Sequence, residues 1–481
     1  MIRKGNVRVN RLHQWLASRN VACGLWTGLC FTLASTVYFS WLQRLVMLTG
    51  SGRADWHSMV VGYLFQAAGA FATMRLLRRP ADNHRRNATV TIALFAAVSA
   101  PAMLTDSLFA VLAFGCLMNL LCGMLSGYYL YAIAVSADAN HRGRAFGAGY
   151  AVSTVAVGLM ALAPGGALTR GHPALLVCLA LAGLAAWAAL RLPLFEPAET
   201  PAPADAGNMA EPSGRDVAVT CAVVALISAV KNLGFSFPSA DIQAGLVPQL
   251  SRLPYAIGLA AAGVVIDRNR KNGMICTLAA LALPFIMLGL INEPVPSMAF
   301  WGLDYLFFGF FSVFRVVLLM DMAARARRWE WAALGLAAGR LGDVAGTGAA
   351  LLLSGRQVAL IAVTTVAFAC AVYLLLSRFQ KLYEPAVVQQ KNEREVFESF
   401  CLRSDLSNRE KEVLHMVLAG HSNASIAEAL FITENTVKYH MRNVLQKTGC
   451  KNRTELQRQY TLALYPHFED NIRVMARDDA V

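Results

Sequence analysis

Charged residues are scarce in this sequence. Asp, Glu, Lys and Arg make up only 15% of its 481 residues, whereas 56% are hydrophobic. An average soluble domain is about 25% charged. Depletion on this scale excludes an ordinary water-soluble globule for most of the chain and indicates membrane-spanning segments. The net charge of +13 is then ambiguous, because it fits either a nucleic-acid-binding surface or the basic cytoplasmic loops of a membrane protein.

Paired cysteines and enzyme signatures are also missing. The ten cysteines form no Cys-x-x-Cys pair, and eight of them lie in apolar runs, where Cys behaves as a small hydrophobic residue. This pattern argues against a disulfide framework or a zinc site, so we expect neither a metal nor another cofactor. The sequence has no P-loop, nucleophile elbow or catalytic carboxylate pair in its polar regions. We therefore do not expect an enzyme.

Long apolar runs fill the first 380 or so residues. A membrane-spanning helix needs about 20 mostly apolar residues. Neither heptads nor two-residue alternation runs through these stretches, so we expect spanning helices rather than a coiled coil or a β-barrel. Twelve candidate spans lie near 21–42, 58–77, 88–105, 108–135, 146–164, 173–194, 217–237, 250–267, 274–292, 296–322, 331–354 and 357–378.

The distribution of positive charge predicts how the chain is oriented. Suppose that the N-terminus is inside. The inner segments before the C-terminal region then carry 20 Lys and Arg residues, and the outer loops carry 5. Lys and Arg accumulate in cytoplasmic loops. We therefore expect a multi-pass protein of the cytoplasmic (inner) membrane, surrounded by lipid, with both termini in the cytoplasm.

The spans divide into two sets of six around a Pro-, Ala- and acid-rich stretch at 196–215, which is typical of a flexible linker. The segment GVVIDRNRK, between the eighth and ninth spans, resembles the inner-loop signature of the major facilitator superfamily, Gly-x-x-x-Asp-Arg/Lys-x-Gly-Arg/Lys-Arg/Lys. The positions that fit are Gly263, Asp267, Arg268, Arg270 and Lys271. The resemblance implies a six-plus-six helical bundle. The equivalent loop between spans two and three keeps positive charge but not the pattern.

Five ionisable residues fall within the second set of spans. They are Lys231, Asp304, Arg315, Arg340 and Asp343. Charges at membrane depth are costly and often functional. One interpretation is that they form internal ion pairs that lock the bundle. The other is that they line a central cavity for a small-molecule ligand, an anion because three cations face two acids. The first set of spans offers no comparable acidic residues, which argues against ion-coupled transport.

After the last span the composition becomes polar, and its periodicity predicts four short helices. Ser407 can cap the first helix in a capping box with Glu410. Ser422 and Thr433 can cap the second and third, and Asn452 or Thr454 opens the fourth. A helix, a tight turn and a second helix at this spacing form a helix-turn-helix.

This segment resembles the LuxR/FixJ-type helix-turn-helix of transcription regulators over residues 405–465. The resemblance implies binding to double-stranded DNA, as a homodimer. The matching positions are Leu406, Arg409, Glu410, Glu412, Val413, Leu414, Gly420, Ser422, Asn423, Ile426, Ala427, Leu430, Thr436, Val437, Lys438, His440, Lys447, Arg453 and Leu456.

The third helix is expected to read the DNA. On a period of 3.6 residues, Val437, Met441, Val444 and Leu445 face inward, and the opposite face enters the major groove. Lys438 and Arg442 can donate to guanine, and Tyr439 can lie against a thymine methyl or a phosphate. The other outward or flanking polar residues suit phosphate contacts. These are Thr433, Asn435, Thr436, Lys447, Lys451 and Arg453.

The expected fold is therefore all-α, with a 12-helix membrane bundle and a C-terminal four-helix domain. The parts are a basic cytoplasmic arm (1–20), a first membrane half (21–195), the linker (196–215), a second half (216–380), a connector (381–404), the helix-turn-helix domain (405–465) and a tail (466–481). This organisation predicts a membrane-embedded one-component transcription regulator. The alternative is a solute transporter of the major facilitator type with a fused regulatory helix-turn-helix.

Overall fold

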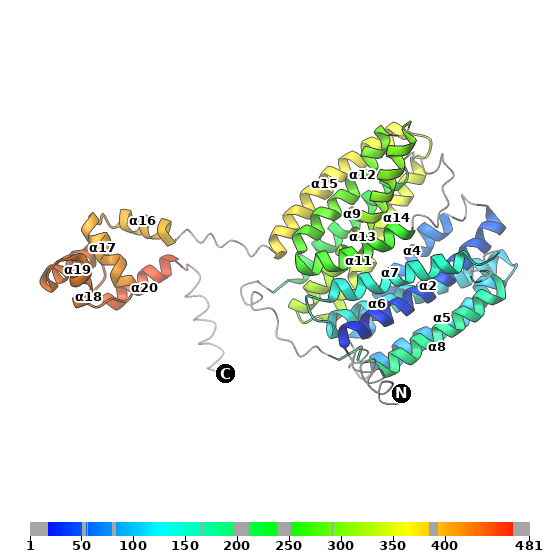
Figure 1. Ribbon diagram of the computed structural model, residues 1–481, viewed down its shortest axis with the longest axis horizontal. Coiled ribbons are helices and arrows are strands. Elements are labelled where there is room, and N and C mark those ends of the chain that lie inside the picture. The colour runs from blue at the N-terminus through cyan, green and yellow to red at the C-terminus, as the bar shows by residue number, and fades with distance from the viewer. Residues whose placement is uncertain are drawn as a thin grey trace, which may run out of the picture. The chain divides into compact units, whose positions relative to one another are not determined.

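The computed structural model describes residues 18–50, 54, 56–78, 83–164, 168, 170–196, 211–237, 252–290, 292–383 and 393–464. It divides into two compact units, residues 1–383 and 384–481 (Figure 1). Every element within the described ranges is a helix. The expected arm at 1–17, most of the linker (197–210), connector residues 384–392 and the tail lie outside the described residues.

The first unit contains two successive sets of helices. The first set is α2 (Arg19–Thr49), the π-helical η1 (Trp56–Gly62) with α4 (Tyr63–Leu77), α5 (His84–Leu104), α6 (Leu108–Ser136), α7 (Arg142–Ala161) and α8 (Gly171–Arg191). The second set is α9 (Gly214–Phe235), α11 (Arg252–Arg268), α12 (Arg270–Gly289), α13 (Pro294–Arg325), the 3-10 helix η5 (Trp329–Ala333) with α14 (Leu334–Leu352), and α15 (Gln357–Tyr383).

Each of the twelve expected spans coincides with one of these helices or abutting helical pairs. Ten of the described helices are long and apolar enough to cross a membrane, and the chain is thus a multi-pass membrane protein. The other two, α11 and α14, are shorter, at 17 and 19 residues. In α14 the apolar run is also interrupted by Arg340 and Asp343, which belong to the candidate site described below.

The two sets of helices repeat one packing pattern. In the first set, α2 packs on α7 and α8, α4 on α6, and α5 on α6 and α8. In the second set, α9 packs on α14 and α15, α11 on α13, and α12 on α13 and α15. Corresponding helices therefore make corresponding contacts, so the six-plus-six division is present in the structure itself.

The halves meet mainly where α7 crosses α11 and where α4 crosses α14. Glycines permit the first crossing. A Cβ atom on Gly147 would lie 2.4 Å from the carbonyl oxygen of Leu259, and one on Gly263 would lie 2.7 Å from that of Gly143. Small residues let helix backbones approach this closely in membranes. Gly263, the first residue of the inner-loop signature, thus serves the contact between the halves.

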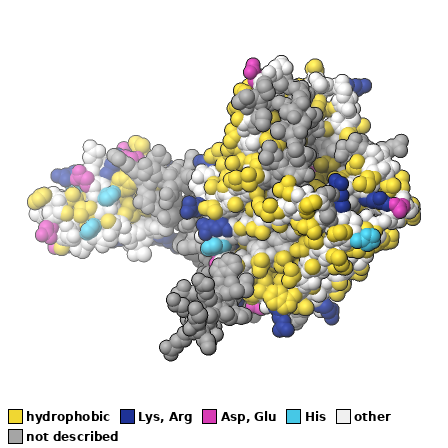
Figure 2. Space-filling model, turned by 45° about the vertical axis from the view of Figure 1, so that its right-hand side comes forward, with side chains coloured by type: hydrophobic (Ala, Val, Ile, Leu, Met, Phe, Trp, Pro, Cys, Tyr) yellow, Lys and Arg dark blue, Asp and Glu magenta, His cyan; other side chains and the backbone are white. Residues whose placement is uncertain are grey.

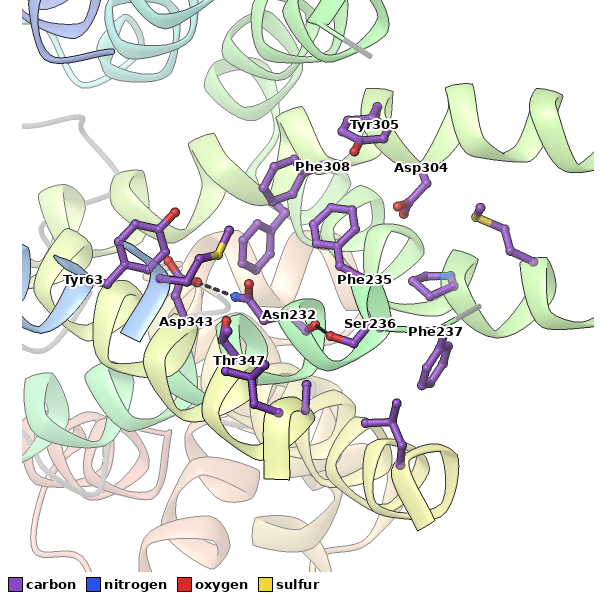
Figure 3. A pocket seen from close by; sticks show the side chains of 18 of the residues that line it. Tyr63, Asn232, Phe235, Ser236, Phe237, Asp304, Tyr305, Phe308, Asp343 and Thr347 are labelled. Carbon is purple, nitrogen blue, oxygen red and sulfur yellow. Dashed lines mark hydrogen bonds between the residues drawn. The ribbon is translucent and has the colours of Figure 1, made fainter. Parts of the chain in front are cut away.

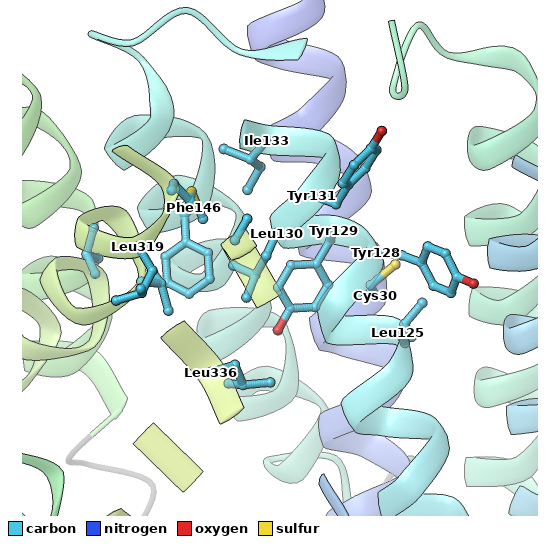
Figure 4. Packing of buried hydrophobic residues seen from close by; sticks show 14 of the residues in the cluster. Cys30, Leu125, Tyr128, Tyr129, Leu130, Tyr131, Ile133, Phe146, Leu319 and Leu336 are labelled. Atoms are coloured by element: carbon cyan, nitrogen blue, oxygen red, sulfur yellow. The ribbon is translucent and has the colours of Figure 1, made fainter. Parts of the chain in front are cut away.

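Apolar side chains both fill the bundle and cover it. One cluster of buried residues draws on both halves, including Tyr129 of α6, Phe146 of α7 and Leu319 of α13 (Figure 4). Hydrophobic side chains also spread over the visible outer face of the bundle (Figure 2). On α8, for example, Leu176 is 68% exposed and Trp187 is 55% exposed. Helices that are apolar all round suit a lipid environment.

Two polar contacts of α2 mark the two ends of the bundle. At the start of α2, Asn20 donates to Asp138, 2.8 Å away, in the turn between α6 and α7. Near the other end of this 31-residue helix, Arg44 pairs with Asp106 in the turn between α5 and α6. A helix rises about 1.5 Å per residue, so these two layers are separated by roughly the thickness of a bilayer.

The second unit has its own hydrophobic core. It comprises α16 (Glu393–Arg403), α17 (Asn408–Leu418), α18 (Asn423–Leu430), α19 (Glu434–Thr448) and α20 (Arg453–Leu464). The last four are the helices expected from the sequence. In addition, α16 packs on α20, with the Phe400 ring 5.5 Å from that of Tyr460. The core of this unit therefore begins before residue 405, inside the segment that the sequence assigned to a connector.

Candidate DNA interface and membrane cavity

Side-chain caps define where the helices of the second unit begin. Ser407 and Glu410 form the expected capping box at the start of α17. Ser422 caps α18 by accepting from the Ser425 N–H, and Thr433 caps α19 by accepting from the Thr436 N–H. Such caps satisfy backbone donors that have no partner within the helix. The sequence-based placement of these three helix starts is confirmed.

The predicted inner face of α19 is also confirmed. Val437 and Val444 are fully buried, Met441 is 9% exposed, and Leu445 packs against the same cluster. On the opposite face Lys438 and Arg442 are exposed and Tyr439 is 62% exposed. Since Lys438 and Arg442 are four residues apart on one helix, they lie on the same stripe.

Two residues assigned to phosphate contacts are engaged within the domain. Lys447 Nζ donates to Glu410 Oε2 at 2.8 Å and to the Asp405 carbonyl at 2.9 Å. Arg453 Nη2 donates to the His421 carbonyl at 2.6 Å and to the Val417 carbonyl at 3.2 Å. These bonds tie α19 to α17 and α20 to the end of α17. Both side chains therefore have a structural role, and their assignment to phosphate contacts stays a prediction, because each keeps further N–H donors.

The Lys447 contact controls the ionisation of Glu410. Burial raises the pKa of this carboxyl, but the hydrogen bonds from Lys447 and from Ser407 outweigh burial and hold the pKa below its usual value. Glu410 is thus a buried carboxylate that stays charged because its partners are fixed.

The remaining candidate DNA contacts differ in their exposure and in their hydrogen bonds within the domain. Thr433 and Thr436 bond each other through their hydroxyls, 2.8 Å apart, at the start of α19. Asn435 is exposed in the first turn of the same helix. Lys451 is exposed as well, and its backbone N–H donates to Glu455. The first turn of α19 therefore presents exposed polar groups beside the Lys438–Arg442 stripe.

A cavity of about 780 Å³ opens within the membrane unit (Figure 3). Its lining reaches from Tyr63 and Arg340, deep in the bundle, to Gly355 in the turn between α14 and α15. Ligand pockets in proteins commonly have volumes of about 300–1,000 Å³. A smaller cavity of about 180 Å³, lined mainly by the first half, shares Tyr63, Tyr150 and Arg340 with it.

Four of the five predicted ligand residues line the larger cavity: Asp304, Arg315, Arg340 and Asp343. At its inner end, two arginines approach one carboxylate. Arg340 Nη1 lies 3.0 Å from Asp343 Oδ2, and Arg315 Nη1 lies 3.5 Å from Asp343 Oδ1. Asn232 also donates to Asp343, at 2.8 Å.

Lys231 does not line the cavity. Its ammonium group is 2.7 Å from Asp304, donates to the Ala280 carbonyl at 3.1 Å, and lies 4.1 Å from the centre of the Phe235 ring. The side chain is 1% exposed. These contacts engage the donors of Lys231 and fit the interpretation of an internal ion pair.

Sequence reasoning missed a second polar site at the end of the bundle where α7 begins. We call Arg142, Asp267, Arg270, Asp321 and Tyr383 the Asp321 cluster. Asp321 accepts from Arg142 at 3.2 Å, from Arg270 at 2.8 Å and from the Tyr383 hydroxyl at 2.8 Å. Asp267 accepts from the Gly143 and Arg144 N–H groups at the start of α7, both at 2.8 Å.

Asp321, on α13, binds side chains from three other parts of the sequence. Arg142 belongs to the first half, Arg270 to the signature loop, and Tyr383 is the last residue of α15. A carboxylate at the end of an apolar span was the available signal for Asp321, but its partners lie far away in the sequence. The signature loop therefore connects the halves to the helix end that leads toward the second unit.

Comparison with known proteins assigns the C-terminal segment. Residues 404–459 match the family described as "Bacterial regulatory proteins, luxR family". This segment is a LuxR-family helix-turn-helix domain. It is 52% identical over 50 residues to the CsgBAC operon transcriptional regulatory protein of Escherichia coli strain K12, covering 10% of this chain and 23% of that protein. The identity to the transcriptional regulatory protein DegU of Brevibacillus brevis is 50% over 50 residues, covering 10% of this chain and 21% of that protein.

The likeness to these regulators covers a small part of the chain. With the nitrate/nitrite response regulator protein NarP of Escherichia coli, identity is 42% over 77 residues, or 15% of this chain and 34% of NarP. The chain thus spans between a fifth and about a third of these relatives.

One solved structure resembles the larger part of the chain. The human organic anion transporter MFSD10 (TETRAN) aligns with a TM-score of 0.48 and 18% identity, covering 76% of this chain and 99% of that one. The six-plus-six arrangement described above rests on the helix pairing within the chain itself.

Proposed function

We propose that the chain is a membrane-embedded one-component transcription regulator. Its LuxR-family domain binds double-stranded DNA, and its twelve-helix domain senses a small-molecule ligand. The observation that supports this most strongly is the joining of these two domains in one chain. In this proposal the protein lies in the cytoplasmic membrane with both termini in the cytoplasm, as the distribution of Lys and Arg favours.

DNA recognition is assigned to the exposed face of α19. Lys438, Tyr439 and Arg442 would lie in the major groove, where Arg and Lys donate to guanine O6 and N7. Thr433, Asn435, Thr436 and Lys451 would contact the phosphates beside the groove. Lys447 and Arg453 are assigned instead to holding α19 and α20 against α17. The region from 405 to 465 carries eight Lys and Arg against six Asp and Glu, so a single domain should bind weakly, and we expect a homodimer on DNA.

The Asp321 cluster offers a route from the ligand to the DNA-binding domain. Residues 384–392 separate Tyr383, the end of α15, from α16, the first helix of the second unit. A ligand that shifts one half against the other alters the contact between Arg142 and Asp321, which also holds Tyr383. The end of α15 therefore moves in response to the same shift. This movement is passed along the chain to the DNA-binding domain.

Solute transport is the second candidate function, because the 780 Å³ cavity lies in a bundle of two similarly packed halves. In that case the helix-turn-helix would report occupancy or flux. Uptake into sealed vesicles containing the purified chain distinguishes the two functions. A transporter accumulates the ligand of its cavity inside the vesicles, whereas a pure sensor binds that ligand without accumulating it.

The regulatory function is tested by crosslinking the full chain to DNA in intact cells and sequencing the DNA recovered with the membrane fraction. We expect a small set of enriched sites that share a two-fold sequence motif. The Arg442→Ala chain, matched for amount in the membrane, should lose that enrichment. Equal recovery of the same DNA with both chains would contradict the proposed function.

A further inference from the structure

The inner end of the large cavity has more hydrogen-bond donors than acceptors. A guanidinium group carries five N–H donors and no acceptor. Arg340 donates one N–H to Asp343. Arg315 donates to Asp343 and also to the Ser228 hydroxyl, which is 3.1 Å away. The Nε atoms of both arginines are buried without a hydrogen-bond partner. Buried donors of this kind are costly when they stay unpaired.

The charges at this point are unbalanced as well. Lys231 and Asp304 neutralise each other at 2.7 Å. Among the described lining residues, this leaves two arginines facing the single carboxylate of Asp343. The Asp343 oxygens also accept from Asn232, so they are shared three ways. One positive charge at the inner end is therefore uncompensated by the described protein groups.

Aromatic rings surround this positive charge. The Arg340 guanidinium lies 4.2 Å from the centre of the Tyr63 ring, and the Arg315 guanidinium lies 5.0 Å from that of Phe311. Tyr255 and Phe308 stack at 4.9 Å on the same cavity wall. A flat apolar body can lie among these rings while its anionic group reaches the arginines.

From these observations we infer that the cavity binds an organic monoanion, a carboxylate carried on an aromatic body. The carboxylate is received between Arg315 and Arg340, and the ring system occupies the aromatic part of the cavity toward Tyr255 and Phe308. The lining extends to Gly355, in the turn at the end of the bundle opposite the Asp321 cluster. The ligand therefore enters from that end. This inference rests on the proposed sensing function and specifies its ligand.

The sign of the charge can be measured before any natural ligand is known. Thr347 lines the cavity one turn beyond Asp343 on α14 (Figure 3). In the purified full chain carrying Thr347→Cys, the reaction rates of an anionic methanethiosulfonate (sulfonatoethyl) and a cationic one (trimethylammonioethyl) are compared, each relative to a free thiol. The chain without the added cysteine gives the background from its ten native cysteines.

We expect the anionic reagent to be favoured about tenfold, since a nearby unscreened positive charge attracts it. Added Arg340→Gln should abolish this preference, and Arg340→Lys should retain it. In the same assay 2-naphthoate should slow modification of the cysteine, whereas its uncharged analogue 2-naphthamide should not. Because the readout involves no DNA, its failure is distinguishable from failure of the regulatory function.

Three results would overturn the inference. The first is equal or greater reactivity of the cationic reagent with Thr347→Cys, which would show that the cavity is not positive. The second is protection by 2-naphthamide that equals protection by 2-naphthoate. The third is no reaction with either reagent, which would show that the cavity is not accessible from solution. The first and third do not depend on whether the Arg340 variants fold.

Discussion

At the scale of single residues, the exposed face of α19 separates base reading from phosphate contact. Arg442→Ala in the isolated 384–481 segment should cost about 1–3 kcal/mol at the preferred site and relax the choice of base at one position. Lys451→Ala should weaken all sequences alike and reduce the salt slope by about one unit. Binding to a randomised duplex pool at several salt concentrations measures both.

The segment must begin before α16, because Phe400 and Cys401 belong to its core. It should be dimerised artificially if one copy binds too weakly. A loss of affinity in Arg442→Ala without any change in base preference would show that the recognition face is placed wrongly.

Lys447 should contribute to stability rather than to DNA affinity. Lys447→Met should lower the free energy of unfolding of the same segment by about 1 kcal/mol at neutral pH. The pKa of Glu410 is depressed in the folded state, so the contribution of this pair is present above the unfolded pKa of about 4.3. It is lost as the pH falls through the lower, folded pKa.

Denaturant unfolding from pH 7 down to pH 3 should therefore show the difference between wild type and Lys447→Met shrinking below about pH 4. Arg409→Met is the matched control, because the Arg409–Glu412 pair is exposed on both sides and should contribute little at any pH. If the Lys447→Met segment were as stable as wild type but bound DNA more weakly, Lys447 would be a phosphate contact and not a stabilising residue.

These residues also show which contacts can be predicted from the sequence and which cannot. The caps of α17, α18 and α19 and the inner face of α19 follow from local spacing, and all of them were predictable. The bonds of Lys447 and Arg453 were not, because their acceptors lie 32 to 42 residues away in the sequence. A surface cation and a cation that ties two helices together have the same sequence pattern until the helices are packed.

At the scale of elements, the crossing of α7 and α11 depends on glycine. Gly263→Val would place its Cβ 2.7 Å from the Gly143 carbonyl oxygen, so the two helices must move apart. Overpacking of this kind costs about 1–3 kcal/mol. We expect a lower melting temperature of the purified chain and less protein in the membrane.

Gly183→Val on α8 is the matched control for this prediction. It is also a helical glycine, but a Cβ there meets nothing within 4 Å. Equal melting temperatures for Gly263→Val and Gly183→Val would contradict the assignment of Gly263 to the contact between the halves.

Helix boundaries within the membrane unit were predictable from apolar runs, but the role of α16 was not. The α16 segment mixes charged and apolar residues, and only its packing on α20 shows that Phe397 and Phe400 face the Tyr460 ring. A short amphipathic helix that completes another domain's core cannot be distinguished from a linker by composition alone.

At the scale of the whole molecule, the sequence predicted two six-span halves and a DNA-binding domain. Of the charges that meet, only Arg340 and Asp343, three residues apart on α14, follow from local spacing. Of five ionisable residues, Lys231 and Asp304 pair with each other, whereas Arg315 and Arg340 converge on Asp343. Both interpretations left open by the sequence therefore have a counterpart in the structure, at different places. Helix packing decides where each applies, because the Lys231–Asp304 and Arg315–Asp343 contacts join different helices.

The central claim is that the state of the membrane domain controls binding of the LuxR-family domain to DNA. The most direct test is occupancy of the preferred DNA site in intact cells by the Tyr383→Phe chain. This change removes the hydroxyl that donates to Asp321 at 2.8 Å and leaves the DNA-binding domain unaltered. Tyr373→Phe is the control, since Tyr373 lies on the same helix and is 72% exposed.

With equal amounts of each chain in the membrane, we expect Tyr383→Phe to raise occupancy, because freeing the end of α15 lengthens the tether of the DNA-binding domain. A lost hydrogen bond to a charged group is worth about 1.5–3 kcal/mol, so the shift can reach tenfold or more. Tyr373→Phe should match wild type. Occupancy that is unchanged in Tyr383→Phe, or changed equally in Tyr373→Phe, would contradict control of DNA binding through the end of α15.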